Sequence, residues 1–155
     1  MPQHAQNVTR KGGPYGRLLA MVLLAFIAMY ILMYAMVSSF DNVYNSVNEF
    51  YMAVLMAAPM AIIELGLMAS MYPNKRLNSV LIAVSAVLMA LSWFGVRNQV
   101  AISDQQFLRS MIPHHAGAIL MCKNNRLTDP ELQKLCADIL SSQQREIDEM
   151  KSKLK

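Results

Sequence analysis

The sequence predicts an all-α membrane protein in which three transmembrane helices precede a two-helix hairpin, itself half of a four-helix bundle. Three observations lead to this fold class. The 155-residue chain is 55% hydrophobic and only 15% charged, which is unusual for a soluble domain. Apolar residues in the last third follow helical spacing. Between Leu18 and Val96 the charged residues are only Asp41, Glu49, Glu64, Lys75 and Arg76.

Three long apolar runs account for the membrane domain. Each is long enough, at about 1.5 Å per helical residue, to cross a hydrocarbon layer of about 30 Å. The first run exceeds the roughly 7–15 apolar residues of a signal peptide and no A-x-A-like site follows it, so we expect it to be retained. The predicted layout is an N-terminal segment 1–17, a membrane domain 18–96 with spans 18–40, 50–72 and 77–96, and a hairpin domain 103–155.

The basic residues that flank the spans predict the orientation. Arg10, Lys11 and Arg17 precede the first span, the first connection has no Lys or Arg, and Lys75 and Arg76 lie in the second connection. By the positive-inside rule the N-terminus is cytoplasmic and the hairpin domain is outside. We therefore expect a bacterial inner-membrane protein with a periplasmic C-terminal domain. No basic stripe is interleaved with aromatic residues, which argues against nucleic-acid binding.

The hairpin is predicted from two helix-start signals. Ser103 is followed three residues later by Gln106, as in a capping box. A second start lies at 128–131, where the T-x-x-E pattern includes Pro130 near the first helical position. Two helices leave an apolar face uncovered, so we expect a homo-oligomer formed through the hairpin, with docking on the membrane domain as the alternative.

The stretch "MIPHHAGAILMC", residues 111–122, carries an unusual number of soft and nitrogen donors. At 100° per residue, its donors fall within an arc of about 120°, so one partner surface can meet them all. Thioethers and thiolates select Cu(I), and imidazole also suits copper. The alternative is that these side chains are ordinary helix core, with a hydrogen-bonded histidine. The donors are Met111, His114, His115, Met121 and Cys122.

"FLRSMIPHHAGAILM" and "DPELQKLCADILSSQQREIDEM" together resemble the ferritin-like family filed as domain of unknown function 305. The resemblance covers roughly 104–155 and implies a ferritin-like helical hairpin. Several members of that family are linked to copper binding and copper tolerance, so the resemblance also favours the metal site. The matching positions are Met111, Ile112, His114, His115, Ala118, Ile119, Met121, Ile139, Gln143, Glu146, Ile147 and Met150.

Met150 and the two cysteines complete the candidate ligands. Met150 lies about ten residues farther from the hairpin turn than His115, roughly 15 Å, so it would serve a separate site or one shared across a dimer. Cys122 and Cys136 have three interpretations: a disulfide in an oxidising compartment, thiolate ligands, or small buried residues.

Methionines also recur in the membrane domain, at positions 29, 33 and 36 of the first span and 52, 56, 60 and 68 of the second. Packed antiparallel, the two spans would form a column of thioethers, although methionine is also an ordinary apolar filler. Glu64 interrupts the second row, and an ionisable group there is costly. It is either a protonated acid bonded to Ser85 or part of a cation or proton relay.

The functional expectation is an inner-membrane protein that binds copper, as Cu(I), and contributes to copper homeostasis or tolerance, with a copper-handling protein as a possible partner. The rival hypotheses are a non-metal membrane adaptor or dimerisation module, and a small cation transporter that uses Glu64. No nucleophile–base pair or nucleotide loop is visible, so no enzymatic activity is predicted. The predicted metal ligands are His114, His115, Met111, Met121, Met150, Cys122 and Cys136.

Overall fold

A computed structural model describes residues 13–154, so most of the predicted N-terminal segment, including Arg10 and Lys11, lies outside the described residues. The described part is all-α, as predicted: it contains α-helices, short 3₁₀-helices and no strand. The α-helices are α1 Pro14–Leu32, α2 Val47–Leu67, α3 Lys75–Asn98, α4 Asp104–Asn124 and α5 Pro130–Lys153. The 3₁₀-helices are η1 Met33–Met36, η2 Phe40–Asn42 and η3 Ala69–Met71.

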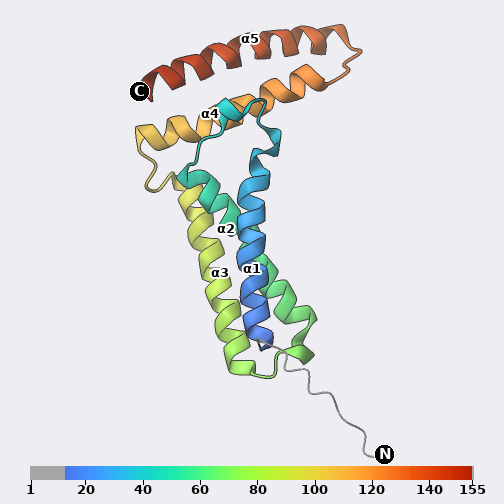
Figure 1. Cartoon of the computed structure of the whole chain (residues 1–155), viewed down its shortest axis with the longest axis vertical. Coiled ribbons are helices and arrows are strands. Elements are labelled where there is room, and N and C mark those ends of the chain that lie inside the picture. The colour runs from blue at the N-terminus through green and yellow to red at the C-terminus, as the bar shows by residue number, and fades with distance from the viewer. Residues whose placement is uncertain (1–12, 155) are drawn as a thin grey trace, which may run out of the picture.

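Helices α1, α2 and α3 form an elongated bundle (Figure 1). All three are long and apolar enough to cross a membrane, counting η1 with α1. Their ends differ from the predicted spans. The first helical stretch, predicted to reach Phe40, ends at Met36, and α2 begins at Val47 and ends at Leu67 rather than at Tyr72. Ser46 sets the start of α2, because its side chain accepts a hydrogen bond from the Glu49 N–H and caps the helix.

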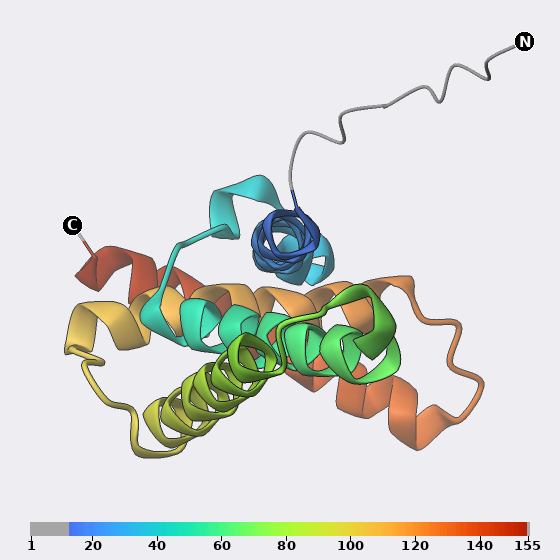
Figure 2. The same cartoon turned by 90° about the horizontal axis from the view of Figure 1, so that it is seen from below.

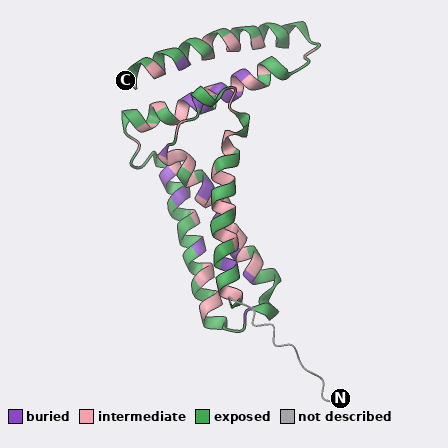
Figure 3. Cartoon of the chain, viewed as in Figure 1, coloured by how far each residue is buried: buried purple, intermediate pink, exposed green. Residues whose placement is uncertain are grey.

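Small side chains form the contacts inside the bundle. Buried positions of α2 are mainly alanines and those of α3 are serine and glycine, whereas leucines such as Leu24 and Leu67 are exposed. Figure 3 shows this pattern as mostly exposed and half-buried ribbon along the bundle. At Gly95 the backbone of α3 lies against the Tyr51 ring, so close that a Cβ would lie 2.8 Å from a ring carbon. Small residues that let helices approach closely are typical of helix packing in membranes.

Helices α4 and α5 lie side by side across one end of the bundle, so that the molecule resembles a T (Figures 1 and 2). Between them is a core of Ile112, Ala116, Ile119, Ile147 and Met150, all buried. Val37 and Tyr44, from the connection between α1 and α2, pack against the same core. The bundle therefore covers part of the apolar face of α4, which corresponds to the docking alternative.

The caps of these two helices follow the sequence signals closely. Ser103 caps α4 as predicted, because its side chain accepts a hydrogen bond from the Gln106 N–H, but the Gln106 side chain accepts from the Val47 N–H and does not complete a capping box. At α5 the capping side chain is Asp129 rather than Thr128, because the Asp129 carboxylate accepts from the N–H groups of Glu131 and Leu132. Pro130 occupies the first helical turn, as expected.

Polar contacts fix α4 on the end of the bundle. The Val47 N–H at the start of α2 donates to Gln106 Oε1 at 3.0 Å. The Asn48 amide donates to Ser110 Oγ at 3.3 Å and to Gln99 Oε1 at 3.2 Å. These bonds join α4 to the starts and ends of the apolar helices, and they frame the cavity described next.

Candidate soft-metal site

A cavity of about 540 Å³ lies where α4 crosses the end of the bundle, and we call it the junction cavity. Its walls come from η1, which follows α1, from the start of α2, from α4 and from Gln99 at the end of α3. Five methionine side chains line it: Met33, Met36, Met52, Met111 and Met121. The cavity is also lined by His114 and Glu49, whose imidazole and carboxylate groups are of types that can bind cations.

The junction cavity joins two groups of donors that the sequence suggested separately. Met111, His114 and Met121 come from the stretch 111–122 on α4, and Met33, Met36 and Met52 come from the upper part of the membrane methionine rows. Gly117 of α4 lies beside the Met36 carbonyl oxygen, and a Cβ added to it would lie 3.6 Å from that oxygen, in ordinary van der Waals contact. His114 and Met121 are exposed, so the cavity is accessible from solvent.

Glu49 lines this cavity but is absent from the predicted ligand set, as are Met33, Met36 and Met52. Its side chain is partly buried, and Oε2 is buried without a hydrogen-bond partner among the described residues. A buried polar atom left without a partner is destabilising, by about 1–3 kcal/mol or more for a charged group. A cation bound in the cavity would give this oxygen a partner. The S-x-x-E pattern at Ser46–Glu49 signals a helix start, but nothing in the sequence places Glu49 beside methionines of α4.

His115 points away from the cavity toward α5. Its Nδ1 lies 2.9 Å from the Met111 carbonyl oxygen and its Nε2 lies 2.7 Å from Glu146 Oε2. A carbonyl only accepts hydrogen bonds, so Nδ1 carries a proton, and the contact with the carboxylate requires a second proton at Nε2 or on Glu146. Ligation of a metal by Nε2 would therefore require that this proton be displaced.

The remaining predicted ligands lie elsewhere. Met150 is buried in the core between α4 and α5, where it packs against other apolar side chains. Cys122 and Cys136 form a disulfide between the end of α4 and the start of α5, with their Cα atoms 5.3 Å apart. This is one of the outcomes that the sequence left open, and disulfide sulfurs are not thiolate ligands. The structure thus brings together Met111, His114 and Met121, and separates them from His115, Met150 and the cysteines.

Thioethers are the most numerous potential ligands in the junction cavity. Among residues 13–154 no three His, Cys, Asp or Glu side chains converge as a zinc or calcium site would require. The donors that line the cavity are five thioethers, one imidazole and one carboxylate, together with the amides of Asn48 and Gln99 and the hydroxyls of Tyr34 and Ser110. Thioethers favour Cu(I) and are poor ligands for hard cations such as Mg²⁺ or Ca²⁺.

The fold defines an all-helical protein with three helices long and apolar enough to cross a membrane. Residues 88–154 match the family described as Domain of unknown function (DUF305). An uncharacterized protein of Acanthamoeba polyphaga mimivirus is 35% identical over 138 residues, which cover 87% of this chain and 89% of that protein. The chain belongs to the DUF305 family. No solved structure matches it.

The extent of these matches is informative for the site. The family match includes α4 and α5 but not Met33, Met36, Glu49 or Met52. The mimivirus protein aligns over 138 residues, so its similarity extends beyond 88–154 into the apolar helices. Seven of the sixteen residues that line the junction cavity therefore lie in a part of the chain that the family match does not cover.

Proposed function

We propose that this is a multi-pass membrane protein that binds Cu(I) in the junction cavity and contributes to copper homeostasis or tolerance. The observation that carries this proposal is the convergence of methionines from both parts of the molecule on one solvent-accessible cavity. Two of these methionines belong to α4, and three belong to the helices of the bundle.

The charge and the donor types favour Cu(I) over other ions. A monovalent cation is matched by the single carboxylate of Glu49, while the thioethers supply soft donors. A divalent ion in the same cavity would keep an uncompensated charge close to an apolar layer, which is costly. His114, at the solvent-accessible side of the cavity, is suited to receive the ion first.

The proposed location is a bacterial inner membrane, with the N-terminus cytoplasmic and α4–α5 periplasmic. The support for this orientation is the placement of basic residues. Arg17, Lys75 and Arg76 lie at the end of the bundle opposite to α4, and Arg10 and Lys11 precede it in sequence. A reporter enzyme that folds only in the periplasm, fused after Lys155, should be active. Activity of a strictly cytoplasmic reporter at that position would contradict the orientation.

The proposal includes assembly through α4–α5, either with a second copy or with a copper-handling protein. Leu132 and Leu135 are about half exposed on the first turns of α5, and they remain uncovered by α4 and the bundle. They form a small apolar surface near the disulfide end of the helix pair, where a partner would reach the mouth of the cavity next to Met121.

The test is a Cu(I) competition titration of the full chain in detergent, with ascorbate to hold copper as Cu(I) and leave the disulfide intact. Met111→Leu with Met121→Leu removes two thioethers from α4, and Met36→Leu with Met52→Leu removes two from the bundle. Such swaps preserve volume and usually cost under about 1.5 kcal/mol of stability. Met89→Leu, on α3 and outside the cavity, is the matched control.

Both double variants should lose at least about tenfold in Cu(I) affinity, equivalent to about 1.4 kcal/mol, while the control binds like the parent. Unchanged binding in both double variants would refute the proposal and favour the adaptor hypothesis, in which α4–α5 only recruits a partner.

A further inference from the structure

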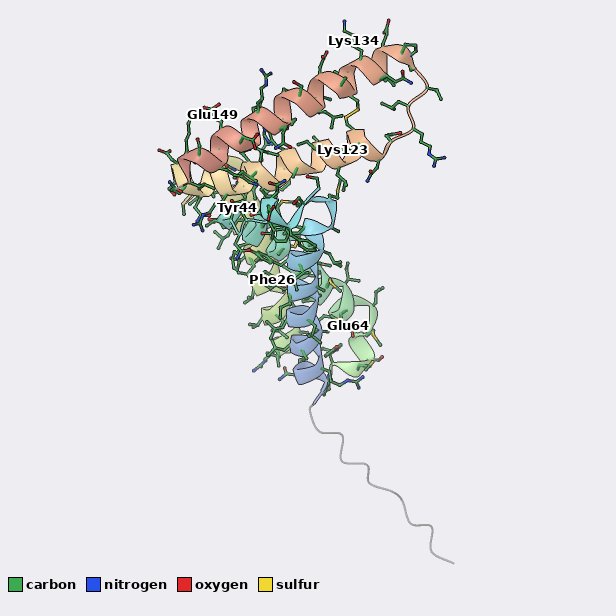
Figure 4. The ribbon with its side chains drawn as sticks, turned by 45° about the horizontal axis from the view of Figure 1, so that its top comes forward. Phe26, Tyr44, Glu64, Lys123, Lys134 and Glu149 are labelled. Carbon is green, nitrogen blue, oxygen red and sulfur yellow. A yellow bond between two sulfur atoms is a disulfide. The ribbon has the colours of Figure 1, made fainter. Side chains whose placement is uncertain are left out.

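A second cavity, of about 270 Å³, lies at the opposite end of the bundle. It is formed by the start of α1, the end of α2 and η3, and we call it the distal cavity. Three methionines, a carboxylate, a phenol and a guanidinium line it: Met21, Met68, Met71, Glu64, Tyr72 and Arg17. In Figure 4, Glu64 is seen on α2 at the end of the bundle away from α4 and α5.

The carboxylate of Glu64 is held in a defined position. Tyr72 Oη donates to Glu64 Oε1 at 3.1 Å. Tyr72 is buried in a small core with Leu18 and Leu65, and its ring packs against that of Tyr15 at 5.4 Å. The bond to Ser85 that the sequence suggested is replaced by this one, because α2 ends at Leu67 and the chain then folds back as η3. Among residues 13–154 only Oε1 of Glu64 has a hydrogen-bond partner, so Oε2 could contact a cation.

The distal cavity therefore repeats the chemistry of the junction cavity: several thioethers around one carboxylate. We propose that the distal cavity is a second Cu(I) site, and that the methionine rows of α1 and α2 join the two sites so that Cu(I) moves along the bundle. This inference rests on the proposed function, because it takes the ion of the junction cavity as its cargo.

Arg17 supplies the positive charge of the distal cavity when no cation is bound. Its side chain is exposed, so it can turn away toward solvent when a cation enters. Like charges at close range disfavour each other, and Arg17 therefore lowers the affinity of this site relative to the junction cavity. A weaker site at the basic, N-terminal end of the bundle suits release of the ion there.

Between the residues that line the two cavities, α1 and α2 carry further methionines. Met29 on α1 and Met56 and Met60 on α2 are half-buried, on two helices that pack against each other. On α2 the methionines at 52, 56, 60 and 68 recur at intervals of four or eight, so the row extends about 24 Å along the helix axis. The row winds around α2 from Met52, which lines the junction cavity, to Met68, which lines the distal cavity.

The first test counts Cu(I) ions per chain by the same titration with ascorbate. The parent should bind a second equivalent that Met21→Leu with Met68→Leu removes, while the junction ion is retained. Met111→Leu with Met121→Leu should remove the junction ion and leave the distal one. Arg17→Gln should tighten the distal site at least about tenfold, because it removes the competing charge. Met89→Leu should retain both ions.

The two proposals fail in different ways. Loss of all bound Cu(I) in the Met111/Met121 variant, with none lost in the Met21/Met68 variant, would overturn the distal site and leave the junction site standing. If Met111→Leu with Met121→Leu leaves Cu(I) binding unchanged, the junction site is overturned instead.

The second test measures movement along the bundle in vesicles that contain the full chain and enclose a Cu(I)-sensitive dye. Met60 lines neither cavity, so Met60→Leu should leave both ions bound at equilibrium. Because the variant lacks one thioether of the route, Cu(I) should appear inside the vesicles at least about tenfold more slowly. Entry at the parental rate in Met60→Leu, or no entry above that of protein-free vesicles in the parent, would overturn the route along α1 and α2.

Discussion

The helix pair α4–α5 and the three-helix bundle are stabilised by different kinds of contact. The pair buries large side chains, including Ile112, Ile119 and Ile147, and a disulfide closes one end. Apart from the small core of Leu18, Leu65 and Tyr72, the bundle buries small side chains, such as Ala53 and Gly95, and it exposes most of its leucines. The first pattern is that of a core formed in water, and the second is that of helices packed in lipid.

The difference explains why the candidate site lies where it does. A core formed in water excludes polar donors unless they are paired, as His115 is paired with Glu146. A bundle in lipid has no water to satisfy polar groups inside it. Only at the junction do thioethers from both parts meet a solvent-accessible space, and there Glu49 and His114 join them.

The strongest way to break the comparison is to remove a large side chain from the water-type core. Ile112 is fully buried, so Ile112→Ala should destabilise the helix pair by about 2–5 kcal/mol through lost burial and a cavity. Hydrogen–deuterium exchange should show faster exchange in α4 and α5 and unchanged exchange in α1–α3.

Ile63→Ala is the matched control, because Ile63 is 56% exposed on the outer face of α2. It should have a small effect in either part. Equal destabilisation by the two substitutions would mean that the two regions do not differ as described.

The disulfide gives a second contrast, since the chain has two cysteines and both belong to the helix pair. Cys122 and Cys136 are 14 residues apart. A disulfide that closes a loop of this size lowers the entropy of the unfolded chain and stabilises the folded state by about 3 kcal/mol. Cys122→Ser with Cys136→Ser should lower the melting temperature of the helix pair, and reductant should do the same to the parent but not to the variant. A melting transition that reductant leaves unchanged in the parent would contradict this.

A smaller effect is expected from the close contact inside the bundle. Gly95→Ala places a Cβ within 3 Å of the Tyr51 ring, which is anchored by its hydrogen bond to the Val100 carbonyl. The added Cβ should push α2 and α3 apart and lower the free energy of unfolding by about 1–3 kcal/mol, measured by thermal unfolding in detergent. Gly66→Ala, with nothing within 4 Å of its added Cβ, should be neutral or slightly stabilising. If both alanines behave alike, close approach is not what holds the bundle.

The sequence identifies the apolar helices well because charge-free runs depend only on composition. It does not define their ends, which depend on local bonds. Tyr34 Oη donates to the Tyr44 carbonyl oxygen, and this bond accompanies the turn that follows η1, before Phe40. The predicted end of the second span also placed Glu64 incorrectly. Because α2 ends at Leu67, Glu64 lies in the last turn of the helix, and Arg17 lines the same cavity.

The sequence places only some of the residues of the junction cavity together, for a similar reason. Helical angles place the donors of 111–122 on one arc, but they do not say what faces that arc. In the structure the arc is divided near Met111: His114 and Met121 face the bundle, while His115 and Cys122 face α5. Glu49 could not be assigned from its own surroundings in sequence, because it reaches the cavity only when α4 crosses the start of α2.

X-ray absorption at the copper edge tests the central claim most directly. The sample is the full chain with its disulfide intact and with Met21→Leu and Met68→Leu, loaded with less than one equivalent of Cu(I). The account predicts a first shell dominated by sulfur, which must then come from thioethers, and a loss of sulfur both on Met111→Leu with Met121→Leu and on Met36→Leu with Met52→Leu. A shell of nitrogen and oxygen alone, or a sulfur shell that neither pair of substitutions changes, would contradict it.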